Sequence, residues 1–212
     1  MALDEIELRT VLEAAKNPSR LAKKRGTISA QLWFYPAVAF AAYTGARRGE
    51  VLGMRWSDID FTSKTISISR SVTEKRQLKA PKNDKSRTIS ASAGLISILL
   101  AHRASQAEER LFLGSAYEDG DFVFALADGS LVDPWSFGMA FRDLIRRVGV
   151  TPISLHGLRD THASLCAKAG TGIDVISRRL GHASISITVE RYMYVYNDRD
   201  TDAAAAFDGL VG

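Results

Sequence analysis

The spacing of apolar residues along the chain predicts mostly helices. In residues 4–16, apolar side chains recur at intervals of three and four, as on one face of an α-helix. The same spacing, with the flanking cap residues, predicts helices over residues 29–43, 92–113, 134–148, 155–169, 173–180 and 184–196, and a short helix beginning near residue 46. The caps are explicit at one helix, because Asp133 precedes it, Pro134 begins it and Gly149 ends it.

A different period marks residues 58–90. Apolar and polar residues alternate there in three short runs, as in half-buried strands. The alternating apolar positions are Ile59, Phe61, Ile66, Ile68, Val72 and Ile89. We therefore expect a mostly α fold with a small antiparallel three-stranded β-sheet (α+β), in which a basic segment forms the last turn of the sheet.

Composition narrows the class of protein. The chain has 212 residues, of which 46% are apolar and 25% charged, as in an ordinary globular protein with a sizeable core. A single cysteine, Cys166, cannot form an intramolecular disulfide, and no signal peptide is evident, so we expect a reducing, cytoplasmic compartment. The longest apolar stretch, over residues 32–43, is too short for a membrane-spanning helix, which needs roughly 20 residues.

Charge is unevenly distributed although its sum is only +4. Residues 64–87 hold eight basic residues against two acidic ones, whereas residues 198–212 hold four aspartates against one arginine. A concentrated basic segment is typical of a surface that binds an anionic partner, and the acidic tail is expected to stay away from that partner.

Two short motifs could carry chemistry, and the second is a candidate phosphate site. Arg47 and Glu50 are spaced i, i+3 on one helix face, where the carboxylate can orient the guanidinium. His156 and Arg159 have the same spacing at the start of a helix, where both side chains and the helix end favour an anion. Each motif alone is equally typical of something simpler, a surface ion pair in the first case and a capping histidine in the second.

A third group lies near the C-terminus, where Gly181-His182 is followed by Tyr192, Tyr194 and Tyr196. Taken alone, these tyrosines are typical of packing on an amphipathic helix. A metal site is the competing interpretation of the polar residues His156, Asp160, His162 and His182. His156 and His162 are six residues apart on a helix and point to nearly opposite sides, so no metal is expected. No nucleotide-binding loop of the Walker type is present either.

Read in order, the three motifs make the chain resemble the tyrosine recombinase (phage integrase) family over almost its whole length. Residues 44–60 (TGARRGEVLGMRWSDID), 156–164 (HGLRDTHAS) and 179–192 (RLGHASISITVERY) are similar to the first arginine box, the HxxR box and the final nucleophile box of that family. The resemblance implies cleavage and rejoining of DNA strands through a 3′-phosphotyrosyl intermediate, without metal, ATP or another cofactor.

The resemblance also implies roles for single residues. Tyr192 would be the nucleophile, preferred to Tyr194 and Tyr196 because the family places its tyrosine nine or ten residues beyond the histidine of the final box. Arg47, rather than Arg48, and Arg159 would bind the phosphate oxygens, and Glu50 would orient Arg47. His156 and His182 would donate hydrogen bonds, and His156 would accept the proton of the tyrosine. Lys82 would be the general acid for the leaving oxygen, with Lys85 as the alternative.

The remaining basic residues of the segment are expected to contact DNA phosphates. They are Arg70, Lys75, Arg76, Lys79, Lys85 and Arg87. The resemblance further implies double-stranded DNA at attachment or core sites as the partner, self-association to a tetramer on that DNA, and accessory DNA-bending proteins, with no membrane partner. A non-cleaving DNA-binding homologue and a type IB topoisomerase remain the alternative functions.

Two departures from the family pattern stand out. Asp160 directly follows Arg159, where relatives often carry histidine, and its role is open between lowering the local positive potential and supporting Arg159. The resemblance assigns residues 1–197 to a catalytic domain with no core-binding domain ahead of it, which favours a fragment over a natural minimal protein. Residues 198–212 form an acidic, Ala-rich tail that is expected either to dock on a neighbouring subunit or to fray.

Overall fold

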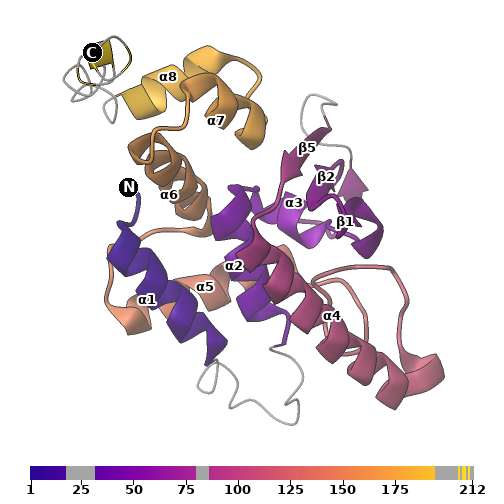
Figure 1. The fold of residues 1–212 in the computed structure, drawn as a ribbon. Helices are drawn as coiled ribbons and strands as arrows, with labels where there is room; N and C mark the ends of the chain where they lie inside the picture. Colours follow the sequence, from indigo (N-terminus) through magenta and orange to yellow (C-terminus); the bar gives the residue numbers. More distant parts are fainter. Residues whose placement is uncertain (18–31, 80–85, 194–204, 206, 209, 211–212) are drawn as a thin grey trace.

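A computed structural model of the protein describes residues 1–17, 32–79, 86–193, 205, 207, 208 and 210. Its α-helices, shown in Figure 1, are α1 (Glu5–Lys16), α2 (Phe34–Thr44), α3 (Arg48–Leu52), α4 (Ala93–Leu113), α5 (Pro134–Val148), α6 (Leu155–Lys168), α7 (Ile173–Leu180) and α8 (Ile185–Tyr192). Lys82, Lys85, Tyr194, Tyr196 and most of the acidic tail lie outside the described residues.

Three strands form the expected antiparallel sheet. They are β1 (Ile59–Asp60), β2 (Thr65–Ile68) and β5 (Arg87–Ser90), in the order β1-β2-β5. Ile66 pairs with both Ile59 and Ile89 in register, so the alternating apolar side chains of the three strands lie on one buried face. The predicted class, mostly helical with a small three-stranded sheet, is therefore confirmed.

The sequence pattern missed one break in the chain. Alternation predicted that Val72 would belong to the same run as Ile68, but the chain leaves the sheet after Ile68. Val72 belongs instead to β3 (Ser71–Val72), which pairs with β4 (Leu78–Lys79) in a separate two-stranded sheet. The buried Val72 side chain belongs to the main hydrophobic core, and β3 contacts α3.

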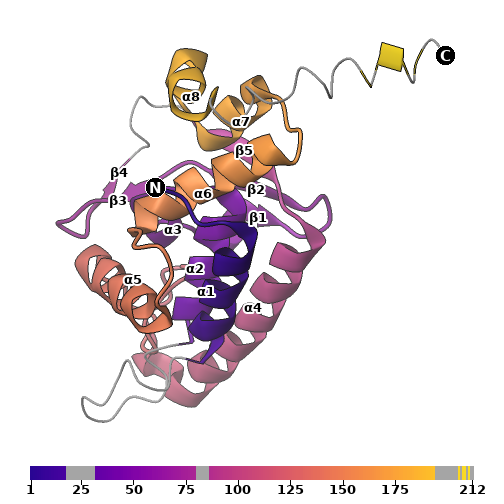
Figure 2. The same ribbon diagram turned by 90° about the vertical axis from the view of Figure 1, so that its left-hand side faces the viewer.

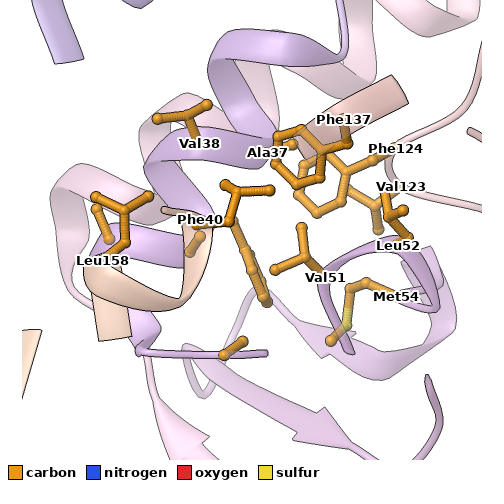
Figure 3. Close-up of a cluster of buried hydrophobic side chains, with 14 of the residues drawn as sticks. Ala37, Val38, Phe40, Val51, Leu52, Met54, Val123, Phe124, Phe137 and Leu158 are labelled. Carbon is orange, nitrogen blue, oxygen red and sulfur yellow. The ribbon is translucent and has the colours of Figure 1, made fainter. Parts of the chain in front are cut away.

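Helix α2 lies at the centre of the molecule, between α1, α4 and α6 (Figures 1 and 2). Nine of its eleven residues are buried, which explains why its sequence is apolar on every side. In the close-up of Figure 3, Phe40 from α2 lies among Val51, Phe124 and Leu158, which come from three other segments. This packing fixes the C-terminal end of α2 against α3 and α6, and the candidate site is built at that end.

A second, smaller group of buried side chains joins α6, α7 and α8, which lie together at one end of the molecule (Figure 1). Its members are Ala163, Ala167, Ile176, Leu180 and Tyr192. This group places the motif of α6 beside the residues that follow α7. Within the described part of the chain, every helix is too short or too polar to cross a membrane.

Candidate active site

Arg159 is held between the C-terminal ends of two helices. Its side chain is 1% exposed, and it donates hydrogen bonds to the carbonyl oxygen of Gly45 after α2 (2.8 Å) and to that of Leu180 at the end of α7 (2.6 Å). Carbonyl groups at helix C-termini carry partial negative charge, which offsets the cost of burying the guanidinium. Burial lowers the pKa of Arg159 to about 10, so the side chain stays cationic at neutral pH.

Gly45 makes this arrangement possible. Its φ of +65° ends α2 in the left-handed conformation, and a Cβ atom there would lie 2.5 Å from Leu180 Cδ2. The glycine therefore allows the chain to turn into α3 and lets α7 approach closely enough for Arg159 to bridge both helix ends. The Thr44-Gly45 pair of the first motif thus has a role in positioning Arg159 as well as Arg47.

Glu50 orients two arginines at the start of α3. One oxygen accepts from Arg47 Nη1 (2.9 Å), and the other accepts from the Arg47 backbone N–H (2.8 Å), as the i, i+3 spacing predicted. Arg87 from β5 also donates to both oxygens of Glu50, at 3.1 and 2.7 Å. Burial alone would raise the pKa of Glu50, but the hydrogen bonds and charges of Arg87 and Arg47 outweigh it and lower the pKa. The carboxylate is therefore ionised and fixed.

The two histidines of the motifs lie near these arginines. His156 is exposed in the first turn of α6, and burial of part of the ring, partly offset by Asp160, lowers its pKa. His182 follows α7, and its Nδ1 lies 2.7 Å from the buried hydroxyl of Thr188. Burial and the nearby cations Arg159 and Arg47 lower the pKa of His182 to about 4, so this ring is neutral at pH 7. When Thr188 donates to Nδ1, the His182 proton is on Nε2, which is then free to donate.

Tyr192 ends α8 with its ring packed against α6 and α7 and only 1% of the residue exposed. Its hydroxyl donates to Asp160 Oδ1 at 2.8 Å. Burial and this hydrogen bond raise the pKa of Tyr192, and the charge of Arg159 acts in the opposite direction. The packing of α6, α7 and α8 thus brings the helices that carry Arg159 and Tyr192 together, and the hydrogen bonds of Arg159 join them to the chain just before Arg47 and just before His182.

An open groove of about 1140 Å³ runs beside Arg47 and His156. Its wall includes Arg48, Arg142 and the segment from Ser71 to Glu74. The guanidinium groups along this groove could bind the phosphate groups of a nucleic acid. The described residues contain no group of three or more His, Cys, Asp or Glu side chains placed to hold a metal ion.

The basic residues of the segment fall into two groups. Lys75, Arg76 and Lys79 are exposed on the hairpin of β3 and β4. Arg76 nevertheless donates to the carbonyl oxygen of Leu131 (2.6 Å). Arg70 and Arg87 form ion pairs inside the protein, with Asp58 and Glu50 respectively. Only 9% of the Arg87 side chain is exposed, so the structure gives it a role in fixing Glu50 that the charge count did not suggest.

The sequence motifs missed the contacts of two further arginines, Arg191 and Arg179. Arg191 Nη1 lies 3.5 Å from both His156 Nε2 and Asp160 Oδ1. Arg179 donates to His162 and to the carbonyl oxygen of Tyr43. None of these contacts has a local signal in the sequence, because the partners are between 17 and 136 residues apart along the chain. Arg191 could have been noticed only as the cation that directly precedes the tyrosine.

Comparison with known proteins gives one family match and several relatives. The model of the phage integrase family matches residues 2–199. A "Tyrosine recombinase XerC-like" protein of Caldanaerobacter subterraneus subsp. tengcongensis is 33% identical over 79% of the chain, and the ICEBs1 integrase of Bacillus subtilis is 30% identical over 85% of it. These matches cover 47% and 50% of those two proteins, so the chain spans about half the length of the curated relatives it matches.

Solved structures share the fold. The Tn1549 transposon integrase in complex with transposon right end DNA superposes with a TM-score of 0.74 at 18% identity, over 100% of this chain and 66% of that one. The XerA recombinase superposes with a TM-score of 0.69 at 23% identity, over 99% and 63% of the two chains.

Proposed function

Since the chain belongs to the phage integrase family, we propose that residues 1–197 act as the catalytic domain of a site-specific DNA recombinase. The proposed reaction is cleavage and rejoining of DNA strands by transesterification, with Tyr192 as the nucleophile. The observation that carries this proposal is that the three distant motifs meet: Arg159 donates to Gly45 of the first motif and to Leu180 of the third, and Tyr192 packs against α6 and α7.

The arginines supply the charge that the reaction needs. Attack of an oxygen nucleophile on a phosphodiester adds negative charge to the two non-bridging oxygens. Arg159 still has N–H groups beyond those that bind Gly45 and Leu180, and Arg47 is held by Glu50 while 37% of its side chain remains exposed. Both cations are therefore fixed before the DNA arrives, which is the arrangement that stabilises a transition state most effectively.

The proposed bond changes use Tyr192, His156, Lys82 and His182. The Tyr192 oxygen bonds to phosphorus and its proton passes to His156, while the bond from phosphorus to the 5′-oxygen breaks. Lys82 donates a proton to the leaving 5′-oxygen, and neutral His182 donates a hydrogen bond to a phosphate oxygen. A 5′-hydroxyl of a partner strand then attacks the phosphotyrosine and regenerates the Tyr192 hydroxyl.

The partner in this proposal is double-stranded DNA at attachment or core sites. The supporting observations are the groove beside Arg47 and the exposed cations Lys75, Arg76 and Lys79. DNA complexes of structural relatives, including XerH bound to difH substrate, support the same partner. Assembly of a tetramer, docking of residues 198–212 on a neighbouring subunit, and accessory DNA-bending proteins belong to the proposal as well.

A covalent adduct tests the proposal directly. The chain is incubated with nicked suicide duplexes that carry candidate attachment sites, and protein bound to DNA is detected on a denaturing gel. We expect an adduct with the wild type and none with Tyr192→Phe, which lacks the attacking oxygen. Lys75→Gln serves as a matched control that weakens DNA binding but keeps the nucleophile.

Assays of DNA binding, plasmid relaxation and strand exchange, together with the adduct, distinguish the alternative functions. Salt-dependent DNA binding without any adduct or relaxation of supercoiled plasmid would identify a non-cleaving binding protein. Relaxation without any exchange between two sites would identify a topoisomerase-like activity. An adduct that persists in Tyr192→Phe would remove Tyr192 from its proposed role.

A further inference from the structure

Asp160 is the residue of the second motif whose role the proposed chemistry leaves open. We propose that Asp160 is a positioning residue that holds the Tyr192 hydroxyl in a protonated resting position, from which the tyrosine must be released before it attacks. This inference rests on the proposed function only in taking Tyr192 as the nucleophile. The contact itself can be tested without DNA.

The contact is short and largely enclosed. Asp160 lies one turn into α6, and Tyr192 lies at the end of α8, where the Tyr192 hydroxyl donates to Asp160 Oδ1 at 2.8 Å. Tyr192 is 1% exposed, and the Asp160 side chain is 20% exposed. In this position the tyrosine packs with Ala163, Ile176 and Leu180, and its reactive oxygen faces a carboxylate. A phosphodiester that approached the Tyr192 oxygen in this position would be repelled by the negative charge of Asp160.

The contact with Asp160 stabilises the protonated, unreactive form of Tyr192. A carboxylate that accepts a hydrogen bond from a phenol stabilises the neutral phenol, because loss of the proton would place two negative charges side by side. Burial raises the pKa of Tyr192 first, and the hydrogen bond and charge of Asp160 add to it, while Arg191 and Arg159 oppose them. A carboxylate is also a far weaker base than a phenolate, so Asp160 is poorly suited to take the proton.

Arg191 provides a partner for Asp160 once the tyrosine leaves. Its Nη1 atom lies 3.5 Å from Asp160 Oδ1 and 3.5 Å from His156 Nε2. The carboxylate can therefore keep a cation nearby when it loses the Tyr192 hydroxyl, which reduces the cost of release. Movement of the hydroxyl away from Asp160 would leave it free to reach His156, the proposed proton acceptor.

Site-resolved nitration of tyrosine tests the contact in the free protein. Tetranitromethane reacts with the phenolate of accessible tyrosines, and mass spectrometry of peptides measures each site separately. We expect Asp160→Asn to nitrate Tyr192 about tenfold faster than the wild type, because without the carboxylate charge the hydroxyl ionises and leaves its enclosed position more readily. Tyr35, which packs near α1, serves as an internal reference and should keep its rate. Asp160→Glu keeps a carboxylate at this position, so it should protect Tyr192 from nitration better than Asp160→Asn does.

A matched control comes from the neighbouring helix. Asp174→Asn removes the same charge from an exposed ion pair with Arg178 on α7, and it should leave nitration of Tyr192 unchanged. Equal nitration of Tyr192 in Asp160→Asn and the wild type would overturn the proposal. So would a parallel rise at Tyr35, which would mean that Asp160 merely stabilises the fold.

Single-turnover cleavage adds the functional arm, with the suicide duplexes described above. Release from the resting position predicts that Asp160→Asn forms the adduct several-fold faster than the wild type. Slower adduct formation together with faster nitration would overturn the resting role, because the carboxylate would then be needed during attack. Absence of any adduct with the wild type would refute the proposed function instead, and the nitration result would still decide the contact.

Discussion

Glu50 is the residue on which the geometry of the arginines depends. It is 2% exposed and accepts hydrogen bonds from Arg47 and Arg87, so its two oxygens are fully used. We expect Glu50→Gln to lower the free energy of unfolding by about 3 kcal/mol. One amide N–H would face the guanidinium groups, and the nearly buried Arg87 and the partly exposed Arg47 would lose their anionic partner. Chemical denaturation measures this loss.

Glu74→Gln is the matched control for Glu50→Gln. Glu74 pairs with Arg48, but its side chain is 68% exposed, so the pair is screened by water. The change should cost under about 1 kcal/mol. Equal losses for the two variants would show that Glu50 is not the buried centre of an ion network.

The proposed role of Lys82 as general acid can be tested by changing the leaving group of the substrate. If it donates the proton to the leaving 5′-oxygen, Lys82→Ala should slow single-turnover cleavage by about 10²- to 10⁴-fold. A substrate with sulfur at the 5′-bridging position leaves as a thiolate, which needs far less protonation, so the variant should cleave it at nearly the wild-type rate. Lys85→Ala provides the control. If the sulfur substrate restored cleavage by Lys85→Ala and not by Lys82→Ala, Lys85 would be the general acid.

At the scale of helices, His162 joins three elements. Its Nδ1 lies 3.0 Å from the carbonyl oxygen of Ala42 in α2, and its Nε2 accepts from Arg179 of α7. Burial and the charge of Arg179 lower the pKa of His162 to about 4. The native state therefore holds a neutral ring, whereas the unfolded chain takes up a proton below about pH 6.5.

The sign of the pH effect follows from this difference. The contribution of His162 to stability is unaffected by pH above about 6.5, and it is lost as the pH falls from there toward 4, where the native state is also protonated. Between pH 7 and pH 5 the loss should be about 1–2 kcal/mol. His162→Gln should reduce this pH dependence by that amount in chemical denaturation. An unchanged pH dependence would mean that the ring is protonated in the native state.

The elements themselves show what a sequence pattern can predict. Helix α5 begins and ends at the predicted residues because Asp133, Pro134 and Gly149 act locally: Asp133 caps the Ser136 N–H, and Gly149 takes a φ of +75°. The break after Ile68 has no such local signal. It depends on the pairing of β3 with β4 and on the close approach of Gly49 to Ser71 and Val72, which are tertiary contacts.

At the scale of the whole molecule, the site is made by helix ends that meet. The sequence motifs named Arg47, His156, Arg159, His182 and Tyr192, but their meeting depends on contacts such as Arg159 with Gly45, 114 residues apart. Spacing along the chain carries no information about such pairs. The same holds for Asp160 and Tyr192, which are 32 residues apart and come together only through the packing of α6, α7 and α8.

The position of the basic hairpin on the molecule gives a last prediction. The hairpin of β3 and β4, with exposed Lys75, Arg76 and Lys79, lies away from the C-terminal end of α4 (Figure 2). Each lysine that neutralises a DNA phosphate releases counterions, so it steepens the fall of affinity with salt. Lys79→Gln should weaken binding to a 30-bp duplex, and the slope of log K against log salt should become shallower by about one.

Arg110→Gln is the control for this charge effect. Arg110 is 58% exposed near the end of α4, where it pairs with Asp119, and the change removes the same single charge. If DNA lies along the hairpin and the groove beside Arg47, Arg110→Gln should leave the slope unchanged, because its distance from the phosphates exceeds the roughly 8 Å over which salt screens charge. Equal slopes for the two variants would mean that only net charge matters, and the hairpin would lose its assignment as the DNA-binding face.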